Sequence, residues 1–271
     1  MHPEQLSKYK ACLFDIDKTL TDFDKVVTPA TVVALAKLRA HGMIIGACTG
    51  RHLATTSNLL TEVFKPEDIH ILAGGGEIVR SSGEVLAGTY IEDELVRKVV
   101  EIVQSHHGRI LFQQGRTIYG NAAAEANKAK YVVNNGPELA VLPLKSAQTW
   151  KTPIIVIGNI TEDVVNQLLQ LPIQMKPMKD YQGKLYADIT ALGVTKGSAL
   201  ATWCKLQHVT PAEVICFGDS ENDKEVIELV GYGVAMGNAI DPLKAIAREV
   251  IGSCEEDGIA KWVDQVLATT R

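Results

Sequence analysis

Short apolar runs that end abruptly on polar residues constrain the fold of this chain more than any other feature. Residues 10–14 form such a run, and Asp15 and Asp17 follow it in "ACLFDIDKTLT". The runs in "MIIGACTG" (43–50) and "VICFGD" (214–219) have the same form. Short strands that are apolar on both faces are typical of a parallel sheet covered by helices. The acids after a strand either open a loop and cap the next helix, or form a charged site.

Helical segments alternate with these runs. In "TPATVVALAKLRAHG", Thr28 suits a helix N-cap, Pro29 the first helical position and Gly42 the stop. Residues 52–63 predict a second helix, and "TKGSALATWCKLQ" predicts a later one that Thr195 caps. Further helices are expected at 221–230, 241–247 and 257–268. The order strand, helix, strand predicts an α/β fold.

The middle of the chain has a different style. "EIVRSSGEVLAG" predicts a hairpin that turns near Ser82 and Gly83, and the segments after it mix strands and helices. We interpret residues 84–184 as an inserted α+β domain. Residues 1–83 and 185–271 would then form the α/β core, with "KLYADIT" as its first strand after the insert.

Composition places the chain among folded globular proteins and gives no sign of a nucleic-acid or membrane partner. The 271 residues are 46% hydrophobic, with a net charge of −5 and a pI of about 5.8. No apolar stretch approaches the ~20 residues that span a bilayer, and the first residues lack a signal-peptide pattern. The five cysteines include no Cys-x-x-Cys pair, which favours buried thiols in a reducing compartment. We expect a cytoplasmic protein that is a monomer or a homodimer.

Charged and polar residues gather where the predicted strands end. Ligands of an open parallel sheet bind beyond the carboxyl ends of its strands. Asp15 with Asp17, Thr49 with Gly50, and Asp219 all follow strands, and a lysine opens the helix at 196. Crowded carboxylates stay ionised when a cation lies between them, and oxygen ligands favour a hard ion such as Mg²⁺.

This residue set suits phosphoryl transfer. Asp15 can attack phosphorus and form an aspartyl-phosphate, while Asp17 protonates the leaving alcohol and then activates water. Lys196 and the Thr49 hydroxyl, with backbone N–H groups beside Gly50, can hold the phosphoryl oxygens. Each feature alone is weak, because a loop acid, a turn or a surface lysine explains it, but their joint order and placement favour a site.

The motifs together resemble the haloacid dehalogenase superfamily of phosphohydrolases, in its Cof-type branch with a type IIB cap. The resemblance is carried by "DIDKTL" (15–20), "CTGR" (48–51), the lysine in "GVTKGSAL" and "GDSENDKEV" (218–226), with "VAMGNA" and "EEDGIAKWV" further on. It covers the core on both sides of the insert and implies a Rossmann-like sheet with an inserted cap that selects the substrate.

The resemblance also implies roles for single residues. Asp15 would be the nucleophile and Asp17 the acid/base. The Mg²⁺ ligands would be the carboxylates of Asp15 and Asp219 and the backbone carbonyl of Asp17. The phosphoryl group would contact four residues: Thr49, Gly50, Lys196 and Asn222. Asp223 would support Lys196 or the waters of the metal.

Two positions depart from the pattern of this branch. Lys18 stands where glycine is usual, and Gly74–Gly76 where Asn-Gly-Ala is usual. Arg51 either lies near the site or forms a structural ion pair. In the insert, the polar residues that could touch substrate are more simply surface groups: Arg116, Asn121, Lys128 and Lys130.

The leading hypothesis is a Mg²⁺-dependent phosphatase acting on a small phosphate ester, which we expect to be a sugar phosphate. The alternative within the same fold is a phosphomutase similar to phosphomannomutases. A non-enzymatic receiver domain uses the same residue types, but it is about half this length and carries its acceptor after the third strand. Here the third strand ends in "AGGG", without an Asp.

Overall fold

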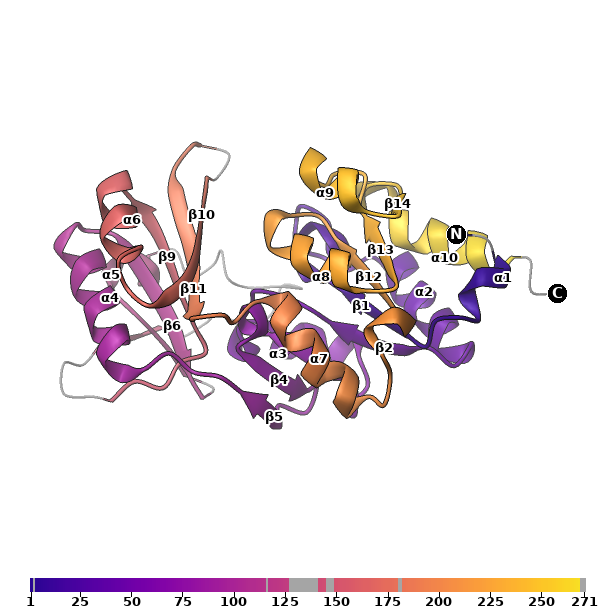
Figure 1. Cartoon of the computed structure of the whole chain (residues 1–271), viewed down its shortest axis with the longest axis horizontal. Helices are drawn as coiled ribbons and strands as arrows, with labels where there is room; N and C mark the ends of the chain where they lie inside the picture. Colours follow the sequence, from indigo (N-terminus) through magenta and orange to yellow (C-terminus); the bar gives the residue numbers. More distant parts are fainter. Residues whose placement is uncertain (2, 116, 127–140, 145–148, 180–181, 269–271) are drawn as a thin grey trace.

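Two sheets dominate the computed structural model of this chain (Figure 1). It describes all residues except 2, 116, 127–140, 145–148, 180–181 and 269–271. The predicted parallel core is confirmed: its five strands have the order β14-β13-β12-β1-β2, and every neighbouring pair is parallel. The bounds are β1 Ala11–Phe14, β2 Ile44–Ala47, β12 Val214–Gly218, β13 Tyr232–Ala235 and β14 Glu249–Val250.

Helices cover this sheet at the positions that the sequence predicts. They are α2 Pro29–Ala40, α3 Leu53–Val63, α7 Lys196–Leu206, α8 Lys224–Leu229, α9 Asp241–Ile246 and α10 Gly258–Leu267, with α1 Pro3–Leu6 before β1. The predicted caps are confirmed, because the Thr28 side chain accepts from Thr31 N–H and the Thr195 side chain accepts from Ser198 N–H. None of the helices in the described ranges is both long and apolar enough to cross a membrane.

Two further sheets occupy the middle of the chain. A three-stranded antiparallel sheet contains β3 Ile69–Leu72, β4 Glu77–Arg80 and β5 Val85–Gly88. The six-stranded sheet, on the left of Figure 1, contains β6 Arg109–Gln114, β7 Thr117–Gly120, β8 Val141–Pro143, β9 Ile154–Ile160, β10 Ile173–Lys179 and β11 Leu185–Ala191. Its helices are α4 Asp93–Ser105, α5 Ala122–Glu125 and α6 Glu162–Leu168.

Strand pairing differs from the predicted insert at both ends. β5 pairs with β4, next to the core, although it begins after residue 84. β11 pairs with β9 and β10 of the six-stranded sheet, so the assignment of "KLYADIT" to the parallel core was wrong. A strand motif does not reveal its partners, because sheet pairing is set by residues far apart in the chain. We propose that the insert begins after β5 and ends after β11.

Burial fixes where the strands of the core end. The four residues of β1 are 0% exposed, and burying a large apolar side chain contributes about 1.5–3 kcal/mol. The rings of Phe14 on β1 and Phe217 on β12 stack with their centroids 4.7 Å apart. Trp203 on α7 is also fully buried and donates its indole N–H to the Ile69 carbonyl at 2.8 Å. A one-residue shift of β1 would break the stacking of Phe14 on Phe217, and in the observed parallel register the carboxyl ends of β1 and β12 lie side by side.

The glycine turn after β3 follows from a close approach of two backbones. Gly75 has φ +103°, and a Cβ atom there would lie 2.0 Å from the Thr195 carbonyl oxygen. Only glycine tolerates both conditions. The turn therefore holds the loop before α7 in place, and α7 begins with Lys196.

Candidate active site

A buried lysine joins two carboxylates at the edge of the core sheet. Lys196 Nζ donates to Asp15 Oδ1 and to Asp223 Oδ1, each at 2.7 Å. The exposed fractions are 5% for Asp15, 2% for Lys196 and 1% for Asp223. Burial acts to lower the pKa of Lys196, but the charges of Asp15 and Asp223 outweigh it and raise this pKa well above its ordinary value. The lysine is therefore a permanent cation beside Asp15.

Asp15 lies one residue beyond the end of β1. Its N–H donates to the Phe217 carbonyl at 2.9 Å, which extends the pairing with β12, and its carbonyl accepts from Leu20 N–H at 3.2 Å. Inside the resulting turn Lys18 has φ 60° and ψ 18°, in the left-handed region. A side chain there costs roughly 1–2 kcal/mol, which is a physical reason for glycine to be usual at this position. Lys18 keeps the same turn.

Asp219 and Asp223 are held by the turn after β12. Asp223 Oδ2 accepts from Asp219 N–H at 3.1 Å and from Ser220 N–H at 3.0 Å. A Cβ atom at Gly218 would lie 2.6 Å from the Asp223 carboxyl carbon, so the close approach requires glycine. Asp223 thus uses one oxygen to fix the loop and the other to bind Lys196.

The carboxylates form a cluster that could hold a divalent cation. One oxygen each from Asp15, Asp219 and Asp223 lie within 4.8 Å of one another. Burial, and then the charge of Asp223, raise the pKa of Asp219 to about 7. Burial also raises the pKa of Asp15 well above its ordinary value, although Lys196 opposes this. A hard cation would relieve this repulsion, and the oxygen donors present fit such an ion.

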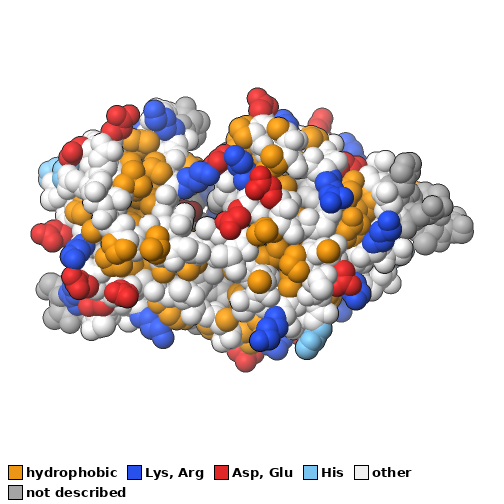
Figure 2. Space-filling view, viewed as in Figure 1, with side chains coloured by type: hydrophobic (Ala, Val, Ile, Leu, Met, Phe, Trp, Pro, Cys, Tyr) orange, Lys and Arg blue, Asp and Glu red, His pale blue; other side chains and the backbone are white. Residues whose placement is uncertain are grey.

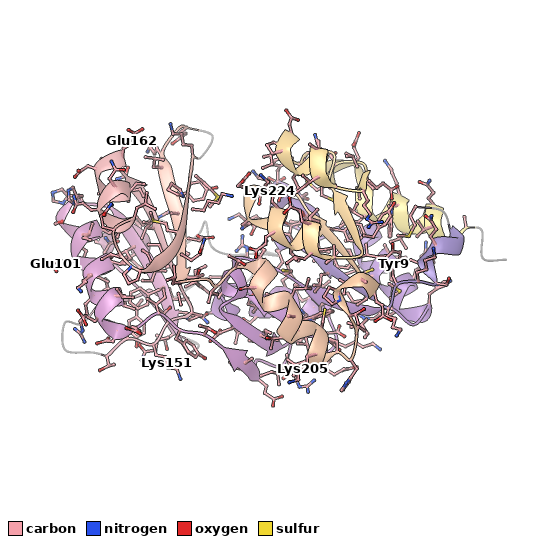
Figure 3. All side chains as sticks on the ribbon, in the orientation of Figure 1. Tyr9, Glu101, Lys151, Glu162, Lys205 and Lys224 are labelled. Atoms are coloured by element: carbon pink, nitrogen blue, oxygen red, sulfur yellow. The ribbon has the colours of Figure 1, made fainter. Side chains whose placement is uncertain are left out.

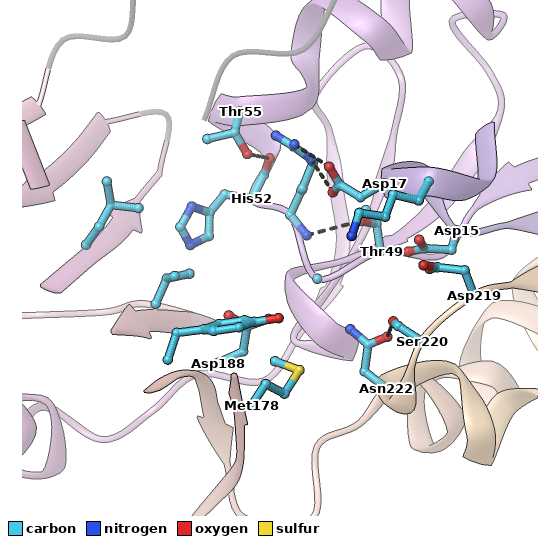
Figure 4. A pocket seen from close by; sticks show the side chains of 16 residues that line it. Asp15, Asp17, Thr49, His52, Thr55, Met178, Asp188, Asp219, Ser220 and Asn222 are labelled. Carbon is cyan, nitrogen blue, oxygen red and sulfur yellow. Dashed lines mark hydrogen bonds and ion pairs between the residues drawn. The ribbon is translucent and has the colours of Figure 1, made fainter. Parts of the chain in front are cut away.

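Asp17 lies apart from this cluster, on Arg51. Arg51 donates to both carboxylate oxygens of Asp17, from Nε at 2.6 Å and from Nη2 at 2.5 Å (Figure 4). Burial acts to raise the pKa of Asp17, but the charge and hydrogen bonds of Arg51 outweigh it and lower this pKa. In this conformation Asp17 is an ionised carboxylate, and both alternatives considered for Arg51 hold: it forms an ion pair and lies at the site.

Three further predicted site residues line the same cavity as the acid cluster and the Asp17–Arg51 ion pair: Thr49, Gly50 and Asn222. Thr49 follows β2, donates its N–H to the Ile71 carbonyl and accepts from Arg51 N–H at its hydroxyl oxygen. The Ser220 hydroxyl donates to Asn222 Oδ1 at 2.9 Å, which leaves the Asn222 amide N–H₂ free to turn toward the cavity. These groups offer hydrogen-bond donors next to Asp15.

A cavity of about 320 Å³ connects these residues to the six-stranded sheet (Figure 4). On the core side it is lined by Asp15, Asp17, Thr49, Gly50, Asp219 and Asn222, together with Arg51, His52 and Thr55. The six-stranded sheet contributes Leu111, Val156, Met178, Tyr186 and Asp188. The cavity therefore has one polar end, where the acids lie, and one mainly apolar end.

A second cavity of about 290 Å³ lies on the other side of Asp188 and Asn222. Figure 2 shows a hollow between the two parts with charged side chains around it, and Figure 3 places Lys224 beside it. Lys176 on β10 reaches across to Glu221, with Nζ and Oε1 2.5 Å apart. Lys196 borders this cavity and not the first one.

The structure brings every residue singled out for the site to one region, around the ends of β1, β2 and β12. Six of the eight residues line the first cavity; Lys196 and Asp223 do not, but Lys196 contacts Asp15, which does, and Asp223 contacts Lys196. The Asn121 side chain caps α5, and the predicted surface residues 116, 128 and 130 lie outside the described residues. Sequence reasoning missed Asp188 and His52. The alternation in "KLYADIT" puts Tyr186 and Asp188 on one face of a strand, which was the available signal.

Comparisons with known proteins agree with this geometry. Residues 12–263 match the model of the haloacid dehalogenase-like hydrolase family. A protein of Yersinia enterocolitica named HMP-PP phosphatase is 30% identical, with 96% of each chain covered. A protein of the same name from Serratia proteamaculans is 25% identical over 96% of each chain.

Solved structures share the whole architecture. A haloacid dehalogenase-like hydrolase from Bacteroides thetaiotaomicron superposes with a TM-score of 0.80 at 23% identity, covering 96% of this chain and 100% of the other. A subclass IIB sugar phosphatase superposes with a TM-score of 0.78 at 24% identity, covering 94% and 98%. The likeness confirms the α/β core with an inserted cap. The chain belongs to the haloacid dehalogenase-like hydrolase family, in its Cof-type branch.

Proposed function

We propose that this hydrolase is a Mg²⁺-dependent phosphatase that cleaves a small phosphate ester through an aspartyl-phosphate on Asp15. The observation that carries the proposal is the buried contact of Asp15 with Lys196, next to Asp219 and at the polar end of a cavity. Because Lys196 occupies Asp15 Oδ1, the Oδ2 atom is left to attack phosphorus.

The reaction has two steps. In the first, Asp15 forms an O–P bond while the bond from phosphorus to the leaving oxygen breaks, and the proton of Asp17 goes to that oxygen. In the second, water attacks phosphorus, Asp17 takes the proton of the water, and Asp15 is released as a carboxylate. Lys196, Thr49 and backbone N–H groups near Gly50 stabilise the charge on the phosphoryl oxygens.

Asp17 changes partners during this cycle. It is ionised on Arg51 in the present conformation, so its role as an acid requires that the carboxylate leave Arg51 and carry a proton to the leaving oxygen. Its position two residues after Asp15 supports this role, because a side-chain rotation can bring it toward a phosphoryl group at Asp15.

The proposed metal ligands are the carboxylates of Asp15 and Asp219 and the backbone carbonyl of Asp17. All are oxygen donors, as Mg²⁺ prefers. When bound, the cation supplies screening between the Asp15 carboxylate and the anionic phosphoryl group. The raised pKa of Asp219, to about 7, supports a position that is occupied by a cation when the site works.

The substrate that we propose is a small phosphorylated metabolite, with a sugar phosphate as the leading candidate. The cavity of about 320 Å³ suits a molecule of that size, and it combines polar groups with an apolar wall. The relatives named above are an HMP-PP phosphatase and a sugar phosphatase, which supports small phosphate compounds in general.

The test is release of inorganic phosphate from a panel of sugar phosphates, nucleotides and p-nitrophenyl phosphate, with Mg²⁺ and with EDTA. We expect Mg²⁺-dependent release and a fall in kcat of more than about 10³-fold in Asp15→Asn. Asp24→Asn, which removes an exposed carboxylate from the same segment, is the matched control and should keep its activity. Wild-type levels of turnover in Asp15→Asn would reject the assigned nucleophile. Interconversion of hexose phosphates with little free phosphate would indicate a mutase.

A further inference from the structure

Asp188 lies midway along β11, the second strand of the six-stranded sheet, and faces the catalytic core. There it pairs with Lys176 of β10 on one side and with Val156 of β9 on the other. Its neighbours Ala187 and Ile189 are 0% exposed in the apolar core of the insert. Strand alternation therefore turns Asp188 to the opposite face, and pairing on both sides fixes its position.

The Asp188 carboxylate reaches the loop that carries the phosphoryl-binding groups. Its Oδ2 atom lies 3.0 Å from where a Cβ atom of Gly50 would be, and the Asn222 amide nitrogen lies 3.7 Å from the same point. Asp188 also borders both cavities. Among the described residues of the six-stranded sheet that line the first cavity, it is the only one with a charged side chain.

Among the residues that the structure describes, the Asp188 carboxylate forms no direct hydrogen bond or ion pair, and the charges of Lys196 and Arg109 act on it only from a distance. Burial raises the pKa of Asp188 to about 6, although the nearby charge of Lys196 opposes this rise. The Asp188 side chain is only partly buried, so water in the cavity can hydrate its carboxylate, and a substrate that displaces this water has to supply a donor in its place. Such a group on the wall of a substrate cavity is satisfied when a ligand brings the donor.

The cavity around Asp188 has the character of a leaving-group site. Leu111, Val156 and Met178 form an apolar wall beside it. On the core side His52 is 2% exposed, and its Nε2 has no hydrogen-bond partner. Burial, and then the charge of Arg51, lower the pKa of His52 to about 3, so the ring is neutral. Figure 4 shows His52 and Asp188 reaching the same cavity from different elements.

We propose that Asp188 is the specificity-determining residue of the insert and accepts hydrogen bonds from O–H or N–H donors on the leaving group of the substrate. A carboxylate this close to the phosphoryl-binding loop repels a phosphate dianion, and a hydrogen-bond donor on the leaving group offsets this repulsion. An ester whose leaving group has hydroxyl or amino groups and an apolar face fits; a purely apolar leaving group leaves Asp188 unsatisfied. This inference rests on the proposed phosphatase activity.

The experiment compares Asp188→Asn with wild type on two kinds of ester. Ribose 5-phosphate and glucose 6-phosphate carry hydroxyl donors, and phosphoethanolamine carries an amino donor. p-Nitrophenyl phosphate has no donor on its leaving group. We expect kcat/KM to fall about 10- to 100-fold for the preferred donor-bearing ester, mainly through KM, and to change less than about threefold for p-nitrophenyl phosphate. Whichever ester, with hydroxyl or with amino groups, has the higher kcat/KM with wild type shows which kind of donor Asp188 prefers.

Two controls keep the result interpretable. Asp163→Asn makes the same change on α6, where the carboxylate is 70% exposed, and should leave kcat/KM unchanged for both kinds of ester. Asp188→Ser removes the carboxylate with a smaller side chain, so it replaces Asp188→Asn if that variant melts more than about 5 °C lower. An equal loss on both kinds of ester, or no loss on the donor-bearing one, would overturn the inference while the phosphatase proposal stands. A wild-type enzyme that hydrolyses none of the esters overturns the proposed function first.

Discussion

Lys196→Met tests whether the buried ion pairs hold the site together. The substitution keeps an unbranched stem of similar length, so packing along α7 is retained, but it removes the ammonium group. Asp15 Oδ1 and Asp223 Oδ1 each lose a donor at 2.7 Å, and both residues stay buried. A loss of stability in Lys196→Met would therefore come from two buried carboxylates without a counter-charge, and not from an unfilled cavity left by a smaller side chain.

The expected magnitude follows from burial. Removing one partner of a buried ion pair costs about 3–5 kcal/mol, and Lys196 is the common partner of two carboxylates. For a chain of this size 1 kcal/mol shifts Tm by about 2–4 °C, so we expect Tm to fall by about 10 °C in EDTA. EDTA matters, because a bound cation would partly replace the missing charge.

The loss should depend on pH. The folded-state pKa of Lys196 lies above its ordinary value of 10.5, so its stabilisation is fully present in the neutral range and is lost only above that value. In the variant Asp15 remains with its pKa raised by burial. The folded state then binds more protons than the unfolded state, and its stability falls as pH rises. The fall in Tm should be larger at pH 8 than at pH 5.

The assay is thermal melting followed by circular dichroism, with Lys205→Met as the matched control. Lys205 lies on the same helix and is exposed, so its loss should shift Tm by less than about 2 °C. The reasoning is refuted if Lys196→Met melts within about 2 °C of wild type, or if its loss is larger at pH 5.

Two further predictions concern other buried groups. His70 Nδ1 accepts from Ala47 N–H at 3.0 Å, so Nε2 donates to Ser81 Oγ, and burial lowers its pKa to about 3. Below pH 6.5 the unfolded state takes up this proton first, so His70 lowers the stability by about 1.4 kcal/mol per pH unit. His52 has the same lowered pKa and contributes a slope of its own. His70→Asn should therefore reduce, by the share of one histidine, the pH slope of urea midpoints measured between pH 5 and 6.5, and an unchanged slope would contradict this. Gly50→Ala places a Cβ atom 3.0 Å from Asp188 Oδ2 and should lower kcat/KM about tenfold; a loss that does not shrink in an Asp188→Ser background would trace the effect to another contact.

The core of the fold could be predicted because its signals are local. β1 and β12 are apolar at every position and end on acids, and Thr28 and Thr195 carry the side-chain oxygens that cap their helices. Once the strands are taken as parallel, the convergence of Asp15 with the acids after β12 follows from topology alone. This convergence can therefore be predicted from strand order and direction, without any interatomic distance.

The substrate end of the cavity could not be predicted in the same way. "KLYADIT" is recognisable as a strand, yet nothing within it shows that β11 pairs with β9 and β10. The Asp188 carboxylate approaches the backbone of Gly50 because two sheets face each other across about 140 residues of sequence, and that approach is set by the packing of the whole insert. Arg51 likewise follows the second motif, but its choice of Asp17 depends on how two loops approach.

The position of Asp188 over the site depends on what holds the insert against the core, and burial decides which contact matters. The Lys176–Glu221 pair bridges the two parts, but its lysine is 54% exposed, and such surface pairs contribute about 0–1 kcal/mol. Gln113 on β6 is 0% exposed, accepts from Ala54 N–H of α3 at 3.2 Å and donates to Glu77 of β4 at 3.0 Å. If the insert moves away from the core without water reaching these groups, both hydrogen bonds are lost. The cost is then roughly 1–3 kcal/mol for each unsatisfied group. The buried amide, and not the charged bridge on the surface, therefore sets how firmly the insert and its carboxylate stay above Asp15.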